Sequence, residues 1–218
     1  MITFPDISFY QDNDGTPQGI DFVQMATQTK AVIIRAGQSF WLDQDFIANW
    51  QGAKAAGLMR GSYWFYDSRT SPKRQAELWR ALIGNDKPEC GLLLDFEESY
   101  GGSYGSDRHM KEFADLVVGK FPNVKVGVYT GYYWWLTRVT WRTRSYWKRF
   151  PLWIAAYPRN PTDGTYKPRV PAPFSNWLYW QYTDSGDGKA YGVESSRIDL
   201  NKFNGTWQDF SSTGHFGA

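Results

Sequence analysis

The sequence contains very little cysteine and histidine. Cys90 is the only cysteine among the 218 residues, and His109 and His215 are the only histidines. A single thiol excludes an internal disulfide, and three soft ligands scattered along the chain are too few for a structural zinc site. We therefore expect no metal and no cofactor, and a fold that packing alone stabilises.

The chain also lacks long apolar runs, a large net charge and a signal sequence. No run of 18 or more apolar residues is present, which excludes a membrane-spanning helix and a membrane as partner. The formal net charge of +2 is too small for the attraction that drives non-specific binding to nucleic acid, so nucleic acid is not expected either. Residues 1–6 contain neither a basic segment nor an apolar stretch before a cleavage site, so export would need another route.

Aromatic residues, by contrast, are abundant. The chain has 12 Trp, 14 Tyr and 14 Phe, which together make 18% of its residues. A chain of this length buries roughly 70% of its unfolded surface and has room for a large core. The aromatic content still exceeds what such a core needs, so we expect some of the rings to face a ligand.

Apolar runs and amphipathic stretches alternate along the chain, as is typical of βαβ units. Amphipathic stretches predict helices at 45–56, 72–83 and 107–120. Short apolar runs predict eight strands, at 2–6, 31–36, 61–65, 91–95, 124–129, 152–156, 177–182 and 197–200. Eight mostly parallel strands favour an α/β fold, an irregular (β/α)8-type barrel with degenerate late helices, over an open doubly wound sheet. We assign residues 1–204 to one barrel domain and residues 205–218 to a C-terminal extension.

Two carboxylates follow each other closely at the end of the fourth predicted strand. Because side chains alternate along a strand, Asp95 and Glu97 point to one side while Phe96 points to the other. Like charges at close range raise the pKa of one member, which keeps a carboxylic acid protonated near neutral pH. The pair alone is equally compatible with two solvated acids at the rim of a barrel.

The positions of two further acids strengthen the chemical interpretation. Asp6 falls at the end of the first predicted strand and Asp199 at the end of the eighth, and strands one and eight are neighbours in a closed barrel. The four acids would then meet at the carboxyl face, where (β/α)8 enzymes place their active sites. Aromatic rings beside carboxylates suit a sugar, and glycoside hydrolysis is the reaction that uses paired carboxylates in this way. The candidate substrate-binding residues are Arg35, Tyr63, Phe65, Tyr129, Trp153, Tyr157, Trp180 and Gln181.

Over roughly residues 5–203 the chain resembles the glycoside hydrolase family 25 lysozymes, or N-acetylmuramidases, which occur among phage endolysins and bacterial and fungal lysozymes. No single matching segment is decisive, but their order and spacing are highly specific. The segments are Asp6-Ile7-Ser8 with Gln11, Val32 to Gly37, Ala55 to Leu58, Gly61 to Phe65, Leu94 to Glu97, Val128 to Thr130, Leu152 to Tyr157, Trp180 to Tyr182, and Ile198 to Asn201.

The resemblance implies a catalytic barrel that cleaves the β-1,4 bond between N-acetylmuramic acid and N-acetylglucosamine in peptidoglycan. Glu97 matches the family's general acid and Asp95 its partner carboxylate. Asp6 and Asp199 match two further acids, expected to bind substrate and tune the pKa of the central pair. The resemblance favours retention of configuration, with the substrate's acetamido group attacking the anomeric carbon and Asp95 orienting it. We expect a monomer acting on the bacterial cell wall, such as a phage endolysin made in the host cytoplasm.

The segment 132–150 fits the family pattern poorly. It contains four tryptophans and five Lys or Arg residues and has no acidic residue. Two interpretations stay open: exposed rings and cations that hold an anionic wall polymer, or a buried amphipathic segment whose arginines keep it soluble.

Two other classes of function compete. A non-catalytic protein that binds wall glycans on the same fold is expected to lose a catalytic acid, yet all four acids are present. A serine hydrolase would use Ser103 in the G-x-S-x-G segment 101–105, with Asp199 and His215. Five residues separate Asp95 from Gly101, too many for a sharp turn between strand and helix, so a glycine-rich loop over the cleft explains the segment better.

Overall fold

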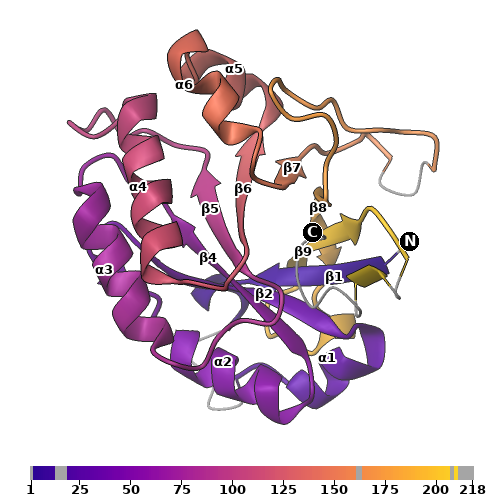
Figure 1. The fold of residues 1–218 in the computed structure, drawn as a ribbon. Coiled ribbons are helices and arrows are strands. Elements are labelled where there is room, and N and C mark those ends of the chain that lie inside the picture. Colours follow the sequence, from indigo (N-terminus) through magenta and orange to yellow (C-terminus); the bar gives the residue numbers. More distant parts are fainter. Residues whose placement is uncertain (1, 13–18, 161–163, 207–208, 211–218) are drawn as a thin grey trace.

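The structure, a computed structural model, describes residues 2–12, 19–160, 164–206 and 209–210. Eight of its strands close into a barrel in the order β1, β9, β8, β7, β6, β5, β4, β2, with β1 also paired to β2 (Figure 1). These strands span Ile2–Ile7 (β1), Ala31–Gln38 (β2), Met59–Phe65 (β4), Leu92–Phe96 (β5), Val126–Gly131 (β6), Leu152–Ala155 (β7), Tyr179–Asp187 (β8) and Arg197–Phe203 (β9). The predicted irregular α/β barrel is confirmed. A two-residue strand, Trp41–Leu42 (β3), folds back antiparallel on β2.

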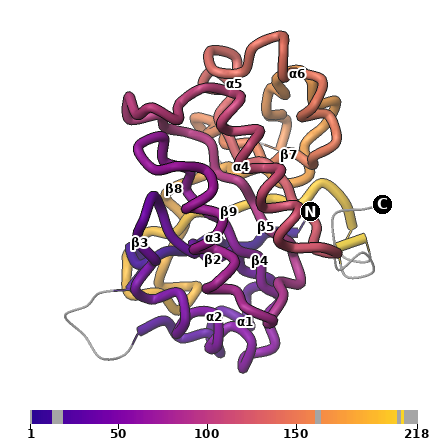
Figure 2. The backbone as a smooth tube through the Cα atoms, turned by 60° about the vertical axis from the view of Figure 1, so that its left-hand side comes forward, coloured from indigo at the N-terminus to yellow at the C-terminus, as the bar shows by residue number. Residues whose placement is uncertain are grey.

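The three helices predicted at 45–56, 72–83 and 107–120 are present, the helices after them are short as predicted, and one further short helix, Phe22–Gln28, was not predicted. They span Phe22–Gln28 (α1), Phe46–Ala55 (α2), Pro72–Ile83 (α3), Asp107–Lys120 (α4), Tyr132–Arg138 (α5) and Trp141–Trp147 (α6). Between β7 and β9 the only helical segment in the described residues is a 3-10 turn, Lys189–Tyr191, and a similar turn, Phe9–Gln11, follows β1. In two views α5 and α6 lie at the opposite side of the barrel from α1 and α2 (Figure 1 and Figure 2).

Local sequence signals set the starts of the two longest helices. Ser71 precedes α3, its side chain accepts a hydrogen bond from the Arg74 backbone, and proline occupies the first helical position. Ser106 caps α4 in the same way, through the backbone N–H of His109. Such caps satisfy backbone donors that have no partner within the helix.

Strand β9 runs opposite to the other seven strands of the barrel. It pairs antiparallel with both β1 and β8, and Asp6 is the register partner of Asp199. The expectation that Asp199 lies at the end of the eighth strand was therefore wrong: Asp199 is the third residue of β9, which runs in the reverse direction. Because β9 is reversed, its first residues lie where the parallel strands finish, and the acids still meet at the carboxyl end.

Side-chain alternation divides the apolar residues between two cores. One core lies between the barrel and its helices and is rich in large rings, such as Trp64, Trp79, Phe96, Phe113 and Trp147. The other fills the barrel and includes Phe4, Ile33, Leu93, Trp153, Tyr179 and Phe203. The next inward positions carry polar groups: Asp6 lies two residues after Phe4, Arg35 two after Ile33, and Asp95 two after Leu93.

The predicted C-terminal extension, 205–218, is described only at 205–206 and 209–210. Phe210 is buried, with its ring centroid 5.0 Å from that of Phe203 and 5.9 Å from that of Phe4. It covers the amino end of the barrel core, because Phe203 ends the reversed strand. The division into a barrel domain and an extension stays a prediction.

Candidate active site

The barrel opens at the carboxyl end of its parallel strands into a cleft of about 310 Å³. Every strand of the barrel contributes to the cleft, directly or through the residues that follow it. Eleven of the twelve residues predicted for the site line it, namely Asp6, Arg35, Tyr63, Phe65, Asp95, Glu97, Tyr129, Trp153, Tyr157, Gln181 and Asp199.

The twelfth, Trp180, lies outside the cleft. Its ring packs with Leu152 and Ile154 on the outer side of the barrel, and its indole N–H donates to the Ala156 carbonyl at 2.7 Å. Neighbouring residues on a strand face opposite sides, so Trp180 and Gln181 cannot both face the cleft. Trp180 therefore belongs to the packing that supports β7 and β8.

The central acids stand as the alternation predicted. Asp95 is the fourth residue of β5 and Glu97 directly follows the strand, and both line the cleft. Phe96 points the other way, with its ring centroid 5.5 Å from that of Tyr66 and 6.3 Å from that of Phe113. The anchored Phe96 ring fixes the end of β5 and with it the side to which both carboxyls point.

Burial raises the pKa of all four acids. It raises that of Glu97 to about 7, against a hydrogen bond with Tyr129 that lowers it. The pKa of Asp199 rises to about 8 through burial and then the charge of Asp6, whose own pKa burial raises to about 6. The pKa of Asp95 lies well above its ordinary range, first through burial and then through the charge of Glu97. The cluster therefore retains protons near neutral pH, and Glu97 is available as a proton donor.

Arg35, the cation that lines the cleft, is held in place by an ion pair and by aromatic rings. The Arg35 Nε donates to Asp43 Oδ2 at 2.8 Å, and both side chains are buried. The guanidinium lies 4.6 Å from the centre of the Phe9 ring and 5.1 Å from that of Trp41. Its charge favours the ionised form of Asp95, while its Nη2 is buried and has no hydrogen-bond partner in the described protein. Arg35 thus offers a fixed donor to a ligand.

A side-chain amide connects two acids of the site. The Gln181 Nε2 donates to Asp6 Oδ2 at 3.0 Å, which fixes the amide so that Oε1 accepts from the hydroxyls of Tyr129, at 2.8 Å, and Tyr157, at 2.6 Å. A hydrogen bond with the Tyr129 hydroxyl lowers the pKa of Glu97. Since a hydroxyl has a single proton, Tyr129 donates either to Gln181 or to the Glu97 carboxylate, but not to both at once.

Asn201, which was not among the predicted site residues, orients the same acid from the neighbouring strand. Its Nδ2 donates to Asp6 Oδ2 at 2.8 Å, and its Oδ1 accepts from the Trp153 indole at 2.7 Å. Asp6 is thus hydrogen-bonded from β8 and β9 together, and its position follows from the closure of the barrel.

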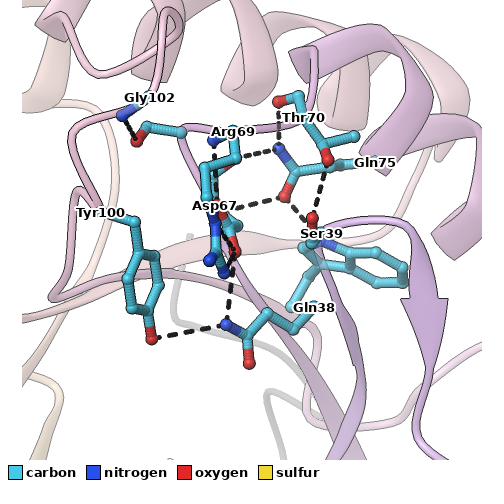
Figure 3. Close-up of polar contacts among 10 residues, drawn as sticks. Gln38, Ser39, Asp67, Arg69, Thr70, Gln75, Tyr100 and Gly102 are labelled. Atoms are coloured by element: carbon cyan, nitrogen blue, oxygen red, sulfur yellow. Dashed lines mark hydrogen bonds and ion pairs between the residues drawn. The ribbon is translucent and has the colours of Figure 1, made fainter.

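One wall of the cleft depends on an ion pair between a buried acid and an exposed arginine (Figure 3). Asp67 is fully buried and lies 2.6 Å from an Arg69 nitrogen. The Arg69 guanidinium lies 4.3 Å from the centre of the Tyr100 ring, and Gln38 donates to both Tyr100 and Asp67 at 3.4 Å. Tyr100 and Gln38 line the cleft, so this cluster sets the position of an aromatic wall.

The glycine-rich loop packs closely against the neighbouring loop. The Gly102 N–H donates to Ser68 Oγ at 2.9 Å, and a Cβ on Gly102 would lie 2.2 Å from the Ser68 carbonyl oxygen. Ser103 is exposed and does not line the cleft, and His215 lies outside the described residues. The G-x-S-x-G match therefore reflects a close backbone approach and does not mark a nucleophile.

Sequence reasoning missed six residues that line the cleft: Ser8, Tyr10, Gln11, Gln38, Tyr100 and Asp184. Three of them, Ser8, Tyr10 and Gln11, directly follow β1, so their position after a strand end was a usable signal. Asp184 lies on β8 beyond an irregularity in the pairing with β9, which no local pattern reveals.

Within the described part of the chain, no group of three or more His, Cys, Asp or Glu side chains is arranged to hold a metal ion. Over the same residues, no helix has the length and apolar character needed to cross a membrane. Cys90 is buried and free, and burial raises the pKa of its thiol, which makes it unreactive.

Comparisons with known proteins agree with this architecture. Lysozyme M1 from Streptomyces globisporus is 30% identical over 195 residues, covering 84% of this chain and 63% of that protein. The autolytic lysozyme of Clostridium acetobutylicum is 30% identical over 176 residues, covering 80% and 48%. The crystal structure of a bacterial lysozyme from Streptomyces coelicolor superimposes with a TM-score of 0.77 at 25% identity, covering 100% of this chain and 98% of that one.

A barrel with clustered carboxyl groups and aromatic rings at its carboxyl end is the architecture of a glycoside hydrolase. The model of the glycosyl hydrolases family 25 matches residues 6–192. The chain belongs to this family, and the resemblance seen in the sequence is confirmed. The match includes Asp6, Asp95 and Glu97, while Asp199 lies beyond it. The chain spans between 48% and 63% of the length of the curated relatives it matches.

Proposed function

We propose that the protein is a peptidoglycan hydrolase that acts at the bacterial cell wall. It cleaves the β-1,4 bond between N-acetylmuramic acid and N-acetylglucosamine, with Glu97 as general acid. The observation that carries the proposal is a carboxyl group that is buried in an aromatic cleft, holds its proton near neutral pH and stands beside three further acids. The family and the named lysozymes among its relatives support the substrate class.

In the first step Glu97 donates its proton to the glycosidic oxygen as the bond to the anomeric carbon breaks. While Glu97 is protonated and its O–H points to the glycosidic oxygen, the Tyr129 hydroxyl donates to Gln181. Once Glu97 has become a carboxylate, the Tyr129 hydroxyl turns and donates to it instead. Hydrogen bonds to a charged group are stronger than those to a neutral one, so this change favours departure of the proton.

The proposal includes retention of configuration. The carbonyl oxygen of the substrate's acetamido group attacks the anomeric carbon and forms a cyclic intermediate, which water opens by adding to the same carbon and giving a proton to Glu97. Asp95 orients the acetamido group. Its Oδ1 is buried and has no hydrogen-bond partner in the described protein, which supports this role because the acetamido N–H supplies a donor.

In this scheme neither Asp6 nor Asp199 donates a proton to the leaving group. Asp6 acts on the central pair through its charge, because its ionisation favours the protonated forms of Asp95 and Glu97. The charges of Asp6 and Glu97 in turn favour the protonated form of Asp199. Arg35 opposes this effect at Asp95, and its free Nη2 is positioned to donate to a substrate oxygen.

The test is digestion of purified peptidoglycan by the unsubstituted protein and by Glu97→Gln, followed by borohydride reduction and mass spectrometry of the fragments. We expect fragments that end in reduced N-acetylmuramic acid, and a loss of roughly 10²- to 10⁴-fold in turnover with Glu97→Gln, because a positioned acid contributes about this factor. Glu112→Gln is the matched control, since Glu112 is exposed, does not line the cleft and is not among the charges that act on Glu97.

Three outcomes contradict parts of the proposal. Unchanged turnover of Glu97→Gln removes Glu97 from the role of acid. If the unsubstituted protein releases no new reducing ends from walls of several types yet sediments with them, it is a glycan-binding protein on the same fold. Fragments that end in reduced N-acetylglucosamine refute the assigned bond.

A further inference from the structure

The positive charge of the chain is concentrated in one region outside the active site. Residues 132–150, which form α5, α6 and the turn before β7, contain five Lys or Arg residues and no acid. The whole chain carries a formal charge of only +2, so the remainder is net negative. A local excess of this kind creates a positive potential that a balanced total conceals.

The structure divides the aromatic residues of this region into two sets. Trp135 and Trp147 are buried in the core beneath the helices, and their ring centroids lie 5.3 Å apart. For these two, the interpretation as a packed amphipathic segment is correct. Tyr133 is 70% exposed and Trp141 is 74% exposed, so packing does not account for them.

The exposed cations are unpaired apart from one. Arg149 lies 3.4 Å from Asp115. Arg138, Arg142, Arg144 and Lys148 are exposed and make no ion pair with the described residues. We call the exposed residues of the two helices the α5–α6 surface, comprising Tyr133, Arg138, Trp141, Arg142, Arg144 and Lys148.

Rings and cations on this surface are next to each other. Trp141 and Arg144 share one face of α6, and Lys148, the C-cap residue with helical backbone angles, continues that face, because the three are spaced by three and four residues. The Arg142 guanidinium lies 4.9 Å from the centre of the Trp141 ring. Alternating rings and guanidinium groups are suited to a polymer that carries both anionic groups and sugars or polyols, since cations attract the first and rings pack on the second.

The location of the surface relates it to the cleft. Helix α5 begins three residues after Tyr129, which lines the cleft, and α5 and α6 lie at the end of the barrel toward which β5 and β6 point (Figure 1). A polymer held on this surface would therefore be attached to the same particle as the glycan in the cleft.

We infer that the α5–α6 surface binds an anionic polymer of the cell wall, of the phosphodiester-linked class, and holds the protein on its substrate. The inference rests on the proposed function for the identity of the particle, but not for the binding itself. Phosphodiesters suit the surface because the planar guanidinium groups of Arg138, Arg142 and Arg144 donate paired hydrogen bonds to phosphate.

The experiment measures sedimentation with purified walls in a Glu97→Gln background, so that hydrolysis does not consume the ligand. The test variant adds Arg138→Glu, Arg142→Glu and Arg144→Glu. The control adds three equal reversals at cations that are exposed and make no ion pair with the described residues, Arg74→Glu, Lys87→Glu and Lys125→Glu. Both triple variants have the same net charge, so a difference between them reports position.

We expect the test variant to bind walls at least about tenfold more weakly than the control, since each cation near an anionic surface contributes roughly a fivefold factor in affinity. Walls stripped of phosphodiester polymers by hydrofluoric acid should bind the unsubstituted surface as weakly as intact walls bind the test variant. Raising the salt to about 1 M, where the screening length is about 3 Å, should release the protein from intact walls. Thermal unfolding of both variants checks that each is folded.

Several results overturn the inference. Equal binding of the test and control variants, or equal binding to stripped and intact walls, removes the polymer as partner. If the unsubstituted protein still binds intact walls at about 1 M salt, the binding is not electrostatic, and this result holds even if the triple variant does not fold. If duplex DNA displaces the protein from walls as well as the released polymer does, the surface recognises polyanions in general. If the unsubstituted protein does not hydrolyse walls but sediments with them in a polymer-dependent way, the proposed function is refuted and the inference about this surface stands.

Discussion

The hydroxyl of Tyr129 provides a sharp test of the acid in the cleft, because it is hydrogen-bonded with Glu97. Tyr129→Phe removes that hydroxyl and retains the buried ring, whose centroid lies 4.5 Å from that of Trp153. The carboxylate form of Glu97 then loses a donor, so its pKa rises further above the value of about 7 that burial already produces. The acid therefore keeps its proton to a higher pH.

The expected size of the effect follows from the strength of such a bond. A hydrogen bond to a charged group contributes about 1.5–3 kcal/mol. Since one pKa unit corresponds to about 1.4 kcal/mol, we expect the pKa of Glu97 to rise by about 1–2 units. In the unsubstituted protein kcat/KM should fall as pH rises through about 7. In Tyr129→Phe the same fall should occur about 1–2 pH units higher, at a lower maximal rate.

The assay is the initial rate of appearance of reducing ends from purified peptidoglycan between about pH 4 and 10. Tyr157→Phe is the matched control, because its hydroxyl also donates to Gln181 but makes no hydrogen bond with Glu97 in this structure. In Tyr157→Phe the fall of kcat/KM at high pH should occur at the same pH as in the unsubstituted protein. If the fall of kcat/KM in Tyr129→Phe stays at the same pH, or moves to lower pH, the assignment of this fall to the ionisation of Glu97 is refuted.

Three further predictions follow from the cluster and its wall. Burial raises the pKa of Asp199 to about 8, so the folded protein binds protons that the unfolded chain releases, and Tm should fall as pH rises from about 4 to 8. Asp199→Asn should flatten that fall in calorimetry, and a Tm that rises over this range contradicts the raised pKa. Asp67→Ala should destabilise the fold by about 1–3 kcal/mol, because it leaves Arg69 and Gln38 without their shared acceptor, and should raise KM more than it lowers kcat. Gly102→Ala should also lower Tm, since the added Cβ would clash with the Ser68 backbone. An unchanged Tm would show that the loop can move away from Ser68 at no cost in stability.

Much of the site was accessible to sequence reasoning because it depends on local alternation. Asp95 and Glu97 share a side through the period of a strand, whatever the rest of the fold does. The same rule, applied more strictly, would have excluded Trp180, since Gln181 next to it faces the cleft. Asp6 and Asp199 were found from their positions on the first and last strands of a closed barrel, and the resemblance assigned them roles, because no local pattern bridges their separation of almost the whole chain.

Other features depend on distant contacts. The reversal of β9 leaves no signal in its own residues, because an antiparallel strand and a parallel one have the same alternation. The aromatic wall at Tyr100 depends on Asp67 and Arg69 in a different loop. The segment 132–150 reads as uniformly basic and aromatic, and only the packing of α5 and α6 separates buried Trp147 from exposed Trp141.

The sequence by itself determined the class of fold, the family and the side of the strand on which the central acids stand. These properties depend on the spacing of residues along the chain, and spacing is visible in the sequence. The tertiary structure decided the direction of β9, the raised pKa values of Asp6, Glu97 and Asp199, and the exposure of the α5–α6 surface. Burial and electrostatic coupling depend on which groups closure of the barrel brings together, and distance along the chain does not encode distance in space.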